Sequence, residues 1–206
     1  MRGLARGLDL GEDVRVQSLL LAAFAPELAG LDLSPPAGWS VGVTGVGALT
    51  AAVETARLVA AHRPARVLFV GTCGALGDRL HSGDLLCVAE ALATSVEERT
   101  GRAYRPEGER VRWPATWPLP FPAHVVAVPP AITLGEEGAR ALAAVAAAEH
   151  LELTGVFAAC AEAGVPAAAA LAVANRAGAQ AHAEWKARHA EVSRALVAAL
   201  RDDGVL

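Results

Sequence analysis

The sequence has few aromatic residues: they make up 4% of its 206 residues, whereas hydrophobic residues as a whole make up 53%. Most of its apolar side chains are therefore those of Ala, Val and Leu, which pack into closely spaced helices and sheets. Proteins that bind single-stranded nucleic acids stack the bases on exposed aromatic rings. The scarcity of rings argues against such a surface, and the composition favours an α/β fold built in layers.

The chain also lacks an excess of basic residues. Lys and Arg number 18 against 22 Asp and Glu, so the formal net charge is -4, and the basic residues are scattered along the sequence. Binding to a phosphate backbone requires a basic patch or stripe. We therefore expect no nucleic-acid partner.

Cysteine is scarce, and its three positions, Cys73, Cys87 and Cys160, contain no C-x-x-C pair. An odd number of widely spaced cysteines indicates neither a disulfide framework nor a zinc site. The six histidines show no ligand spacing either, and we interpret them as surface or loop residues, with His150 close enough to Glu152 to reach a shared site. We expect no metal, no other cofactor, and free thiols in a reducing cytoplasm.

Long apolar runs are missing as well, since no stretch reaches the roughly 18 residues that a membrane span requires. Basic residues precede the apolar run 19–24, as in a secretory signal. Acidic residues lie among them, however, at Asp9, Glu12 and Asp13, where a signal would be positive. We expect this run to be a β-strand of a cytoplasmic protein that does not enter a membrane.

Strand-like and helix-like segments alternate along the sequence. We predict strands at 16–24, 39–43, 66–70, 85–89, 125–128 and 167–174. We predict helices at 25–28, 49–61, 136–148, 151–163 and 182–201. The segment 71–74 is interpreted as a turn and 100–122 as a loop excursion. This alternation is typical of a parallel sheet with right-handed crossovers.

Polar residues follow several of the predicted strands. In open α/β sheets ligands bind beyond the carboxyl ends of the strands. Five residues occupy such positions: Glu27, Thr44, Thr72, Glu152 and Asn175. They are therefore the first candidates for a functional site.

Each candidate also has an interpretation without function. Glu27 could be a first-turn glutamate that the positive end of a helix dipole favours. Thr72 could belong to an ordinary turn, and Asn175 could cap the following segment. Glu152 lies in an otherwise apolar window, where a charged residue is seldom found without a partner, so function is favoured for it.

Three stretches together carry a family resemblance. They are 69–76 followed by Gly83-Asp84, 151–160 followed by Gly164-Val165-Pro166, and 171–175. In their order and spacing they resemble the signatures of the nucleoside phosphorylase and nucleosidase superfamily, over about 19 to 201. The resemblance implies a single domain over 1–206, with three α/β/α layers around a central mixed, mostly parallel sheet.

The resemblance also assigns roles to individual residues. Glu152 matches the glutamate that holds the ribose hydroxyls, and Glu27 falls on the acid that activates water in the hydrolases. Thr72 matches a residue near the sugar and the nucleophile. The other expected substrate-binding residues lie around the sugar and the base, and they are Gly74, Ile132, Thr133 and Leu151.

Asn175 stands where the adenosine-type nucleosidases have an aspartate that protonates N7 of the base. An amide cannot deliver a proton, but it can donate a hydrogen bond to the departing base. Asparagine is similar to what 6-oxopurine enzymes use. The stretch 174–178 with Trp185 resembles futalosine hydrolases, whose base is hypoxanthine.

The nucleophile and the substrate follow from the same comparison. Phosphorylases of this superfamily bind phosphate with arginine, but 25–27 and 44–47 contain none, so we expect water to attack. We expect a nucleosidase that cleaves a futalosine-like purine nucleoside. A methylthioadenosine/S-adenosylhomocysteine nucleosidase, a phosphorylase and a catalytically degenerate nucleoside-binding member are the alternatives. The Ala-rich helices indicate a homodimer or a higher homo-oligomer.

Overall fold

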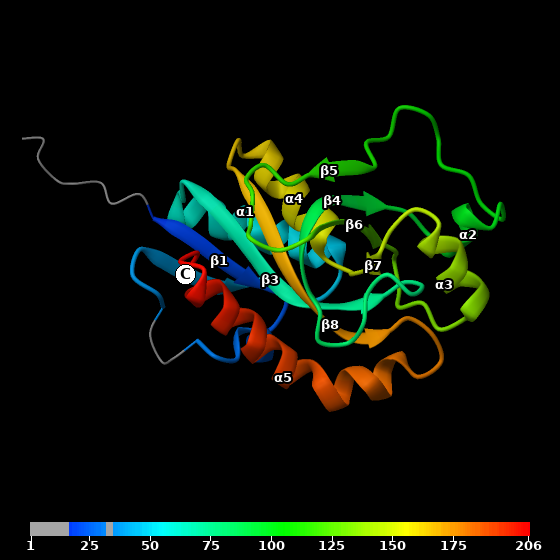
Figure 1. The fold of residues 1–206 in the computed structure, drawn as a ribbon. Helices are drawn as coiled ribbons and strands as arrows, with labels where there is room; N and C mark the ends of the chain where they lie inside the picture. Colours follow the sequence, from blue (N-terminus) through cyan, green and yellow to red (C-terminus); the bar gives the residue numbers. More distant parts are fainter. Residues whose placement is uncertain (1–16, 32–34) are drawn as a thin grey trace, which may run out of the picture.

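The structure is a computed structural model that describes residues 17–31 and 35–206. Its strands are β1 (Ser18–Ala22), β2 (Trp39–Val43), β3 (Arg66–Ala75), β4 (Leu85–Ala93), β5 (Arg112–Pro114), β6 (Ala123–Val128), β7 (Ala148–Glu149) and β8 (Ala167–Arg176). Its helices are α1 (Ala48–His62), α2 (Val96–Arg99), α3 (Glu136–Ala143), α4 (Leu153–Glu162) and α5 (Ala181–Asp202), and η1 (Ala25–Leu28) is a 3₁₀ turn. Figure 1 shows strands and helices alternating along the chain.

The strands form one mixed sheet in the order β2-β1-β3-β7-β6-β4-β5, and β8 pairs with both β3 and β4. The pairs β1/β2, β1/β3, β3/β8, β4/β6 and β6/β7 are parallel. The pairs β3/β7, β4/β5 and β4/β8 are antiparallel. The prediction of a mixed, mostly parallel sheet is therefore confirmed.

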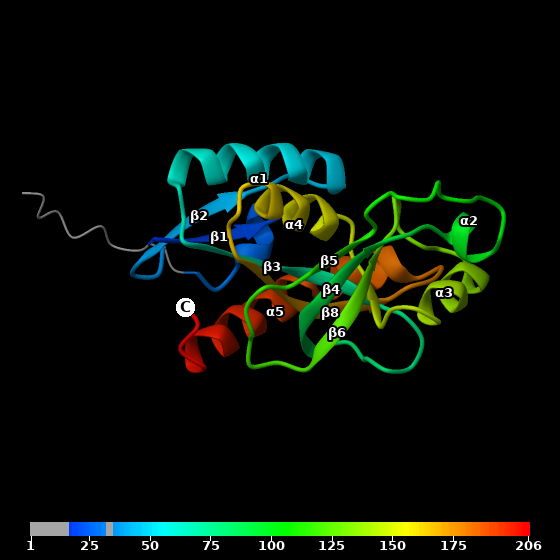
Figure 2. The ribbon, with the colours of Figure 1, turned by 90° about the horizontal axis from the view of Figure 1, so that it is seen from above.

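Helices cover both faces of this sheet, with α1 and α4 on one side and α5 on the other (Figure 2). Successive side chains of β1 point to opposite faces of the sheet. Leu19 and Leu21 pack with α1 and α4, and Leu20 and Ala22 pack with α5. A strand that is buried on both faces needs apolar residues at every position, which explains its unbroken apolar sequence. The predicted three-layer α/β/α architecture is confirmed.

The contact between α1 and α4 depends on a glycine. A Cβ atom at Gly155 would lie 1.9 Å from the carbonyl oxygen of Ala48, so no larger residue fits between the two helices. Gly155 lies in the first turn of α4, and Ala48 is the first residue of α1. The close approach therefore brings the amino-terminal ends of both helices together.

Several predicted elements are wrong in detail. The helix predicted at 136–148 ends at Ala143, because Ala148 and Glu149 form β7 and pair with β3 and β6. The predicted turn 71–74 continues β3, since its backbone pairs with β8. The predicted loop 100–122 contains β5, which pairs with β4. In all three places, pairing with distant strands overrides the local pattern.

Val16, the first residue of the predicted strand 16–24, lies outside the described residues. Within 17–31 and 35–206, no helix combines the length and the apolar character that a membrane crossing requires.

Candidate active site

A cavity of about 480 Å³ opens where β1, β3 and β8 end. Seven of the nine residues predicted for the site line it: Glu27, Thr72, Gly74, Ile132, Leu151, Glu152 and Asn175. Residues that the sequence analysis did not assign to the site complete the wall, namely Ala23, Phe24, Val46, Cys73, Glu149, His150, Ala181, His182 and Trp185. The cavity thus collects residues from both halves of the chain at the edge of the sheet where ligands of α/β proteins bind.

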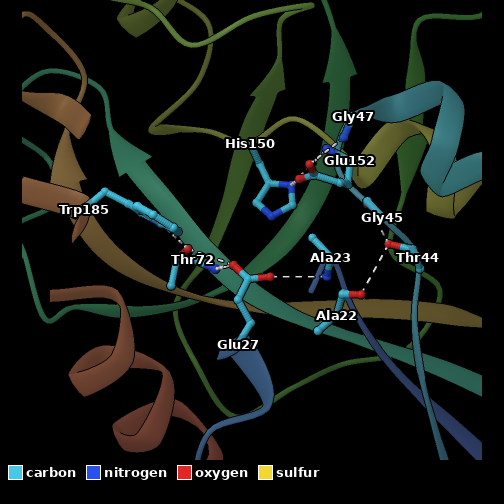
Figure 3. A network of polar contacts seen from close by, with 10 residues as sticks. All are labelled: Ala22, Ala23, Glu27, Thr44, Gly45, Gly47, Thr72, His150, Glu152 and Trp185. Carbon is cyan, nitrogen blue, oxygen red and sulfur yellow. Dashed lines mark hydrogen bonds and ion pairs between the residues drawn. The ribbon is translucent and has the colours of Figure 1, made fainter. Parts of the chain in front are cut away.

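Glu27 is buried in η1, directly after β1, and its carboxyl group points toward β3 (Figure 3). Its Oε1 accepts hydrogen bonds from the backbone N–H and from the hydroxyl of Thr72, each 2.8 Å long. Its Oε2 accepts a weaker bond of 3.2 Å from the backbone N–H of Ala23. Three donors therefore fix the orientation of this carboxyl group.

Burial raises the pKa of Glu27 from 4.5 to about 7. The hydrogen bonds from Thr72 act in the opposite direction, because they stabilise the ionised form, and the nearby charge of Glu152 raises the pKa further. A carboxyl group with a pKa near neutrality can take up a proton and release it again at neutral pH. This is the property that a general base requires.

Glu152 is buried at the amino-terminal end of α4. Its Oε1 accepts a 2.8 Å hydrogen bond from the backbone N–H of Gly47, the residue before α1. The contact between α1 and α4 at Gly155 fixes the position of the Gly47 N–H relative to the carboxyl group of Glu152. Glu152 is thus a fixed hydrogen-bond acceptor in the cavity wall.

His150 is buried against Glu152, which corrects its interpretation as a surface or loop residue. Its Nδ1 lies 3.1 Å from Oε2 and 3.2 Å from the backbone nitrogen of Glu152. Burial lowers the pKa of His150, while the charge of Glu152 acts in the opposite direction. In Figure 3 the imidazole lies between Glu152 and Glu27, so it separates the two carboxyl groups with a polar ring.

Asn175 reaches the cavity from the end of β8, and its Nδ2 donates a 3.1 Å hydrogen bond to the carbonyl of Arg176. One N–H of this amide is therefore used, and the second hydrogen of Nδ2 remains for a ligand. Thr44 lies outside the cavity wall, where its buried hydroxyl donates a 3.3 Å hydrogen bond to the carbonyl of Ala22. Thr133 lies outside the wall as well. It is buried beside Glu149, where its backbone N–H donates to Oε1 of that residue over 3.2 Å.

Aromatic side chains form the part of the cavity wall beside Thr72. The indole Nε1 of Trp185 donates a 3.0 Å hydrogen bond to the hydroxyl of Thr72, which in turn donates to Glu27. The rings of Phe24 and His189 contact Trp185 at centroid distances of 5.8 and 4.3 Å. Trp185 therefore provides a flat apolar surface and orients the hydroxyl group that binds the carboxyl group of Glu27.

The cavity has an acidic lining. Its wall contains three glutamates, and among the described residues that form it there is no arginine or lysine. Nor does the described part of the chain contain a group of three or more His, Cys, Asp or Glu side chains arranged to hold a metal ion. The arrangement suits a neutral ligand with several hydroxyl groups better than an anion.

Glu149 was not predicted from the sequence, and His150 was interpreted as a surface or loop residue, although its proximity to Glu152 was expected to let it reach a shared site. Both follow a segment whose alanines predict a helix, and nothing in that pattern reveals the two-residue strand β7. The sequence offered one indication that these two residues belong to the site, namely that they directly precede Leu151 and Glu152. Phe24 and His182 carry no comparable signal, because their place in the wall depends on how η1 and α5 pack together.

Comparisons with known proteins agree with the resemblance seen in the sequence. A model of the phosphorylase superfamily matches residues 39–150. A mutant of futalosine hydrolase from Helicobacter pylori strain 26695 has a similar structure, with 20% identity, a TM-score of 0.74, and coverage of 91% of this chain and 100% of that chain. No curated protein matches the chain.

Two nucleosidases have similar structures as well. The 5'-methylthioadenosine/S-adenosylhomocysteine nucleosidase of Helicobacter pylori is 19% identical, with a TM-score of 0.74 and coverage of 91% of this chain and 99% of that chain. The corresponding nucleosidase of Colwellia psychrerythraea, in complex with adenine, is 17% identical, with a TM-score of 0.73 and coverage of 89% and 91%. At these identities the likeness shows the fold.

Proposed function

This chain belongs to the phosphorylase superfamily, and we propose that it is a nucleosidase that hydrolyses the N-glycosidic bond of a purine nucleoside. The observation that carries the proposal is the convergence of Glu27, Glu152 and Asn175 on one cavity. Each has the chemistry of one part of the reaction: activation of water, binding of the sugar and stabilisation of the departing base. The known structures of similar fold include nucleosidases.

Glu27 activates the attacking water. Its ionised carboxyl group accepts a proton from the water as the oxygen bonds to C1' of the ribose, and the C1'–N9 bond breaks with its electron pair going to the base. Thr72 and Ala23 hold the carboxyl group in place through their donors. The pKa of about 7 makes this proton transfer nearly balanced at neutral pH.

Glu152 binds the ribose. Its carboxyl oxygens accept hydrogen bonds from the sugar hydroxyls. The backbone N–H of Gly47 donates to its Oε1, and its own backbone N–H donates to Nδ1 of His150, so that both contacts keep the residue in place. Leu151 lines the cavity beside it and packs on the sugar. Positive charge develops on the sugar as the bond breaks, and the negative field of the acidic wall stabilises it.

Asn175 and Ile132 bind the base. The free N–H of Asn175 donates to a ring nitrogen or carbonyl oxygen of the purine, which supports a 6-oxopurine such as hypoxanthine over adenine. Ile132 is half exposed at the cavity wall and covers the base from one side. Thr133 acts through Glu149 rather than on the ligand directly.

The lining of the cavity supports water as the nucleophile. Phosphate would need cationic or N–H donors in the wall, and the described lining residues include no arginine or lysine. A phosphate dianion next to Glu27 and Glu152 would also be repelled. Hydrolysis is therefore favoured over phosphorolysis.

A second cavity of about 500 Å³ adjoins the first at Leu151. It provides space for a large substituent on the 5' position of the ribose, which supports a futalosine-like nucleoside. Arg105 in its wall is already paired with Glu98 and Glu109, at 2.7 and 2.6 Å. Methylthioadenosine and S-adenosylhomocysteine remain the alternative substrates.

The active enzyme is a homodimer or a higher homo-oligomer. Val46, two residues before α1, is 60% exposed, and Leu49 and Val53, one helical turn apart at the start of α1, are 81 and 60% exposed. Exposed apolar groups of this kind mark interaction surfaces. Val46 also lines the cavity, so a second copy on this face would close the mouth of the site. Leu49→Glu tests this: it should convert the oligomer to monomers in sedimentation experiments.

The reducing cytoplasm is the proposed setting. Cys73, Cys87 and Cys160 are free and buried. Burial raises the pKa of Cys160 to about 12, so this thiol is unreactive at neutral pH. These cysteines act as small apolar core residues and do not require an oxidising compartment.

The proposal is tested by incubating the purified protein with inosine, futalosine, methylthioadenosine or adenosine, with and without phosphate. Free base should appear without phosphate, fastest from a nucleoside of hypoxanthine. Preference for methylthioadenosine would favour the adenosine-type nucleosidase. If no base is released from any of the four, the chain is a degenerate nucleoside-binding member, and the proposal fails.

A further inference from the structure

Glu149 and Asn175 meet across a single glycine. Gly74 of β3 pairs with Glu149 of β7 on one side and with Asn175 of β8 on the other. A Cβ atom at Gly74 would lie 3.0 Å from Nδ2 of Asn175 and 3.4 Å from Cγ of Glu149. The two side chains thus share the space that a larger residue at position 74 would fill, and all three residues line the cavity.

One oxygen of Glu149 lacks a partner. Oε1 accepts a hydrogen bond from the backbone N–H of Thr133, whereas Oε2 is buried and has no hydrogen-bond partner among the described residues. The residue is only 5% exposed. A buried oxygen of this kind costs free energy unless a ligand or a proton satisfies it.

The surroundings of Glu149 favour the protonated form. Burial raises the pKa of its carboxyl group, and the hydrogen bond from Thr133 offsets this only in part. The Cys73 thiol lies close by and carries no charge at neutral pH, because burial raises its pKa too. No cation in the described part of the chain acts on Glu149.

We propose that Glu149 is a second catalytic acid of this site, which protonates the departing base while the amide of Asn175 holds it. The inference rests on the proposed nucleosidase function. As the C1'–N9 bond breaks, its electron pair passes to the base, and the proton of Glu149 goes to a nitrogen of that base. Glu27 receives the proton lost by water. Transfer of one proton from Glu27 to Glu149 through solvent restores both groups, so the sum is hydrolysis.

The roles of the two neighbours are complementary. Asn175 positions the base but cannot release a proton, whereas Glu149, which lines the same cavity, can release one. General acid catalysis contributes roughly 10²–10⁴-fold in rate. A site that retained the amide but lost the acid would therefore bind its substrate normally and turn it over slowly.

The test compares Glu149→Gln, Glu149→Asp and the surface control Glu136→Gln with the wild type on inosine. The glutamine variant retains the size and the acceptor for Thr133 but cannot supply a proton. It should lower kcat by about a hundredfold or more and change KM less than about threefold. Glu149→Asp should retain more of kcat than the glutamine variant, and Glu136→Gln should match the wild type.

Infrared spectroscopy of the ligand-free proteins adds a readout that does not need turnover. The difference between wild type and Glu149→Gln at neutral pH should contain the carbonyl band of one protonated carboxyl group. Absence of the band, an unchanged kcat, or a rise in KM alone would each overturn the inference. If the wild type releases no base at all, the nucleosidase proposal fails first, and the band still reports whether Glu149 carries a proton.

Discussion

Gly47 and Glu152 lie 105 positions apart in the sequence, yet the backbone N–H of Gly47 donates a 2.8 Å hydrogen bond to Oε1 of Glu152. The two residues are the positions immediately before α1 and α4. Because the helices touch at Gly155, their amino-terminal ends are fixed relative to each other. The orientation of the Glu152 carboxyl group, which we propose binds the ribose, therefore depends on the packing of two helices as well as on the sheet.

Glu152→Gln should reduce kcat/KM by about 10²–10³-fold without unfolding the protein. The amide retains one acceptor oxygen, but its NH₂ group faces either Gly47 or the ribose hydroxyls, which are themselves donors. Nucleoside turnover, with circular dichroism as a check on folding, measures the effect. Glu136→Gln, on the exposed face of α3, is the matched control. Full activity in Glu152→Gln would remove this residue from the site.

The pH dependence of turnover should follow Glu27. A general base acts in its ionised form, and burial raises the pKa of Glu27 to about 7. We expect kcat/KM of the wild type to rise as the pH increases through about 7 and, since Glu149 acts as the acid, to fall again at the higher pH where Glu149 loses its proton. Glu27→Gln should have very low activity with no such rise. A wild-type profile that is flat between about pH 5 and pH 8 would exclude Glu27 as the base.

Glu27 should also make the folded state less stable as the pH rises. The unfolded chain releases the Glu27 proton near pH 4.5, whereas the folded protein retains it to about pH 7. Folding therefore takes up a proton between these values, and raising the pH disfavours folding. The free energy of unfolding of Glu27→Gln, relative to the wild type, should increase by up to about 3 kcal/mol over this range. Urea unfolding at both ends of the range measures it.

A control variant distinguishes this effect from the general pH dependence of the protein. Glu136→Gln removes an exposed carboxyl group from α3, so its stability relative to the wild type should not vary over the same range. A difference between Glu27→Gln and the wild type that stays constant, or that falls with pH, would show that Glu27 is not held with a raised pKa.

Gly155→Ala should destabilise the protein by about 3 kcal/mol or more, since the added methyl group would overlap the backbone of α1. Backbone atoms cannot move aside as a flexible side chain can. Gly135→Ala is the matched control: a Cβ atom there meets nothing within 4 Å, and we expect a change below about 1 kcal/mol. Equal stability of the two variants would contradict the close contact between α1 and α4.

Elements with a strong local pattern could be predicted from the sequence. The strand at Trp39–Val43 and the turn at Ala25–Leu28 have the bounds that were predicted. The strand at 167–174 is two residues longer, because Asn175 and Arg176 continue to pair with β3. Periodicity and proline position carry enough information for such segments.

Elements that form only because they pair with strands distant in the sequence could not be predicted. The alanines before β7 favour a helix by propensity, and only pairing with β3 and β6 makes Ala148 and Glu149 a strand. The same limit applies to the site. Glu27, Glu152 and Asn175 could be selected from the sequence, and His150 could be connected with the site through its proximity to Glu152. Glu149 becomes a candidate only once β7 is known to enter the cavity wall.

The central claim is that this cavity hydrolyses a nucleoside with water as the nucleophile. Incubation of the wild-type protein with inosine or futalosine in water enriched in heavy oxygen, followed by mass spectrometry of the sugar, tests it most directly. The claim predicts free hypoxanthine and a sugar that carries the heavy oxygen at C1', with or without phosphate. A sugar 1-phosphate that forms only when phosphate is added, or the absence of any released base, would contradict it.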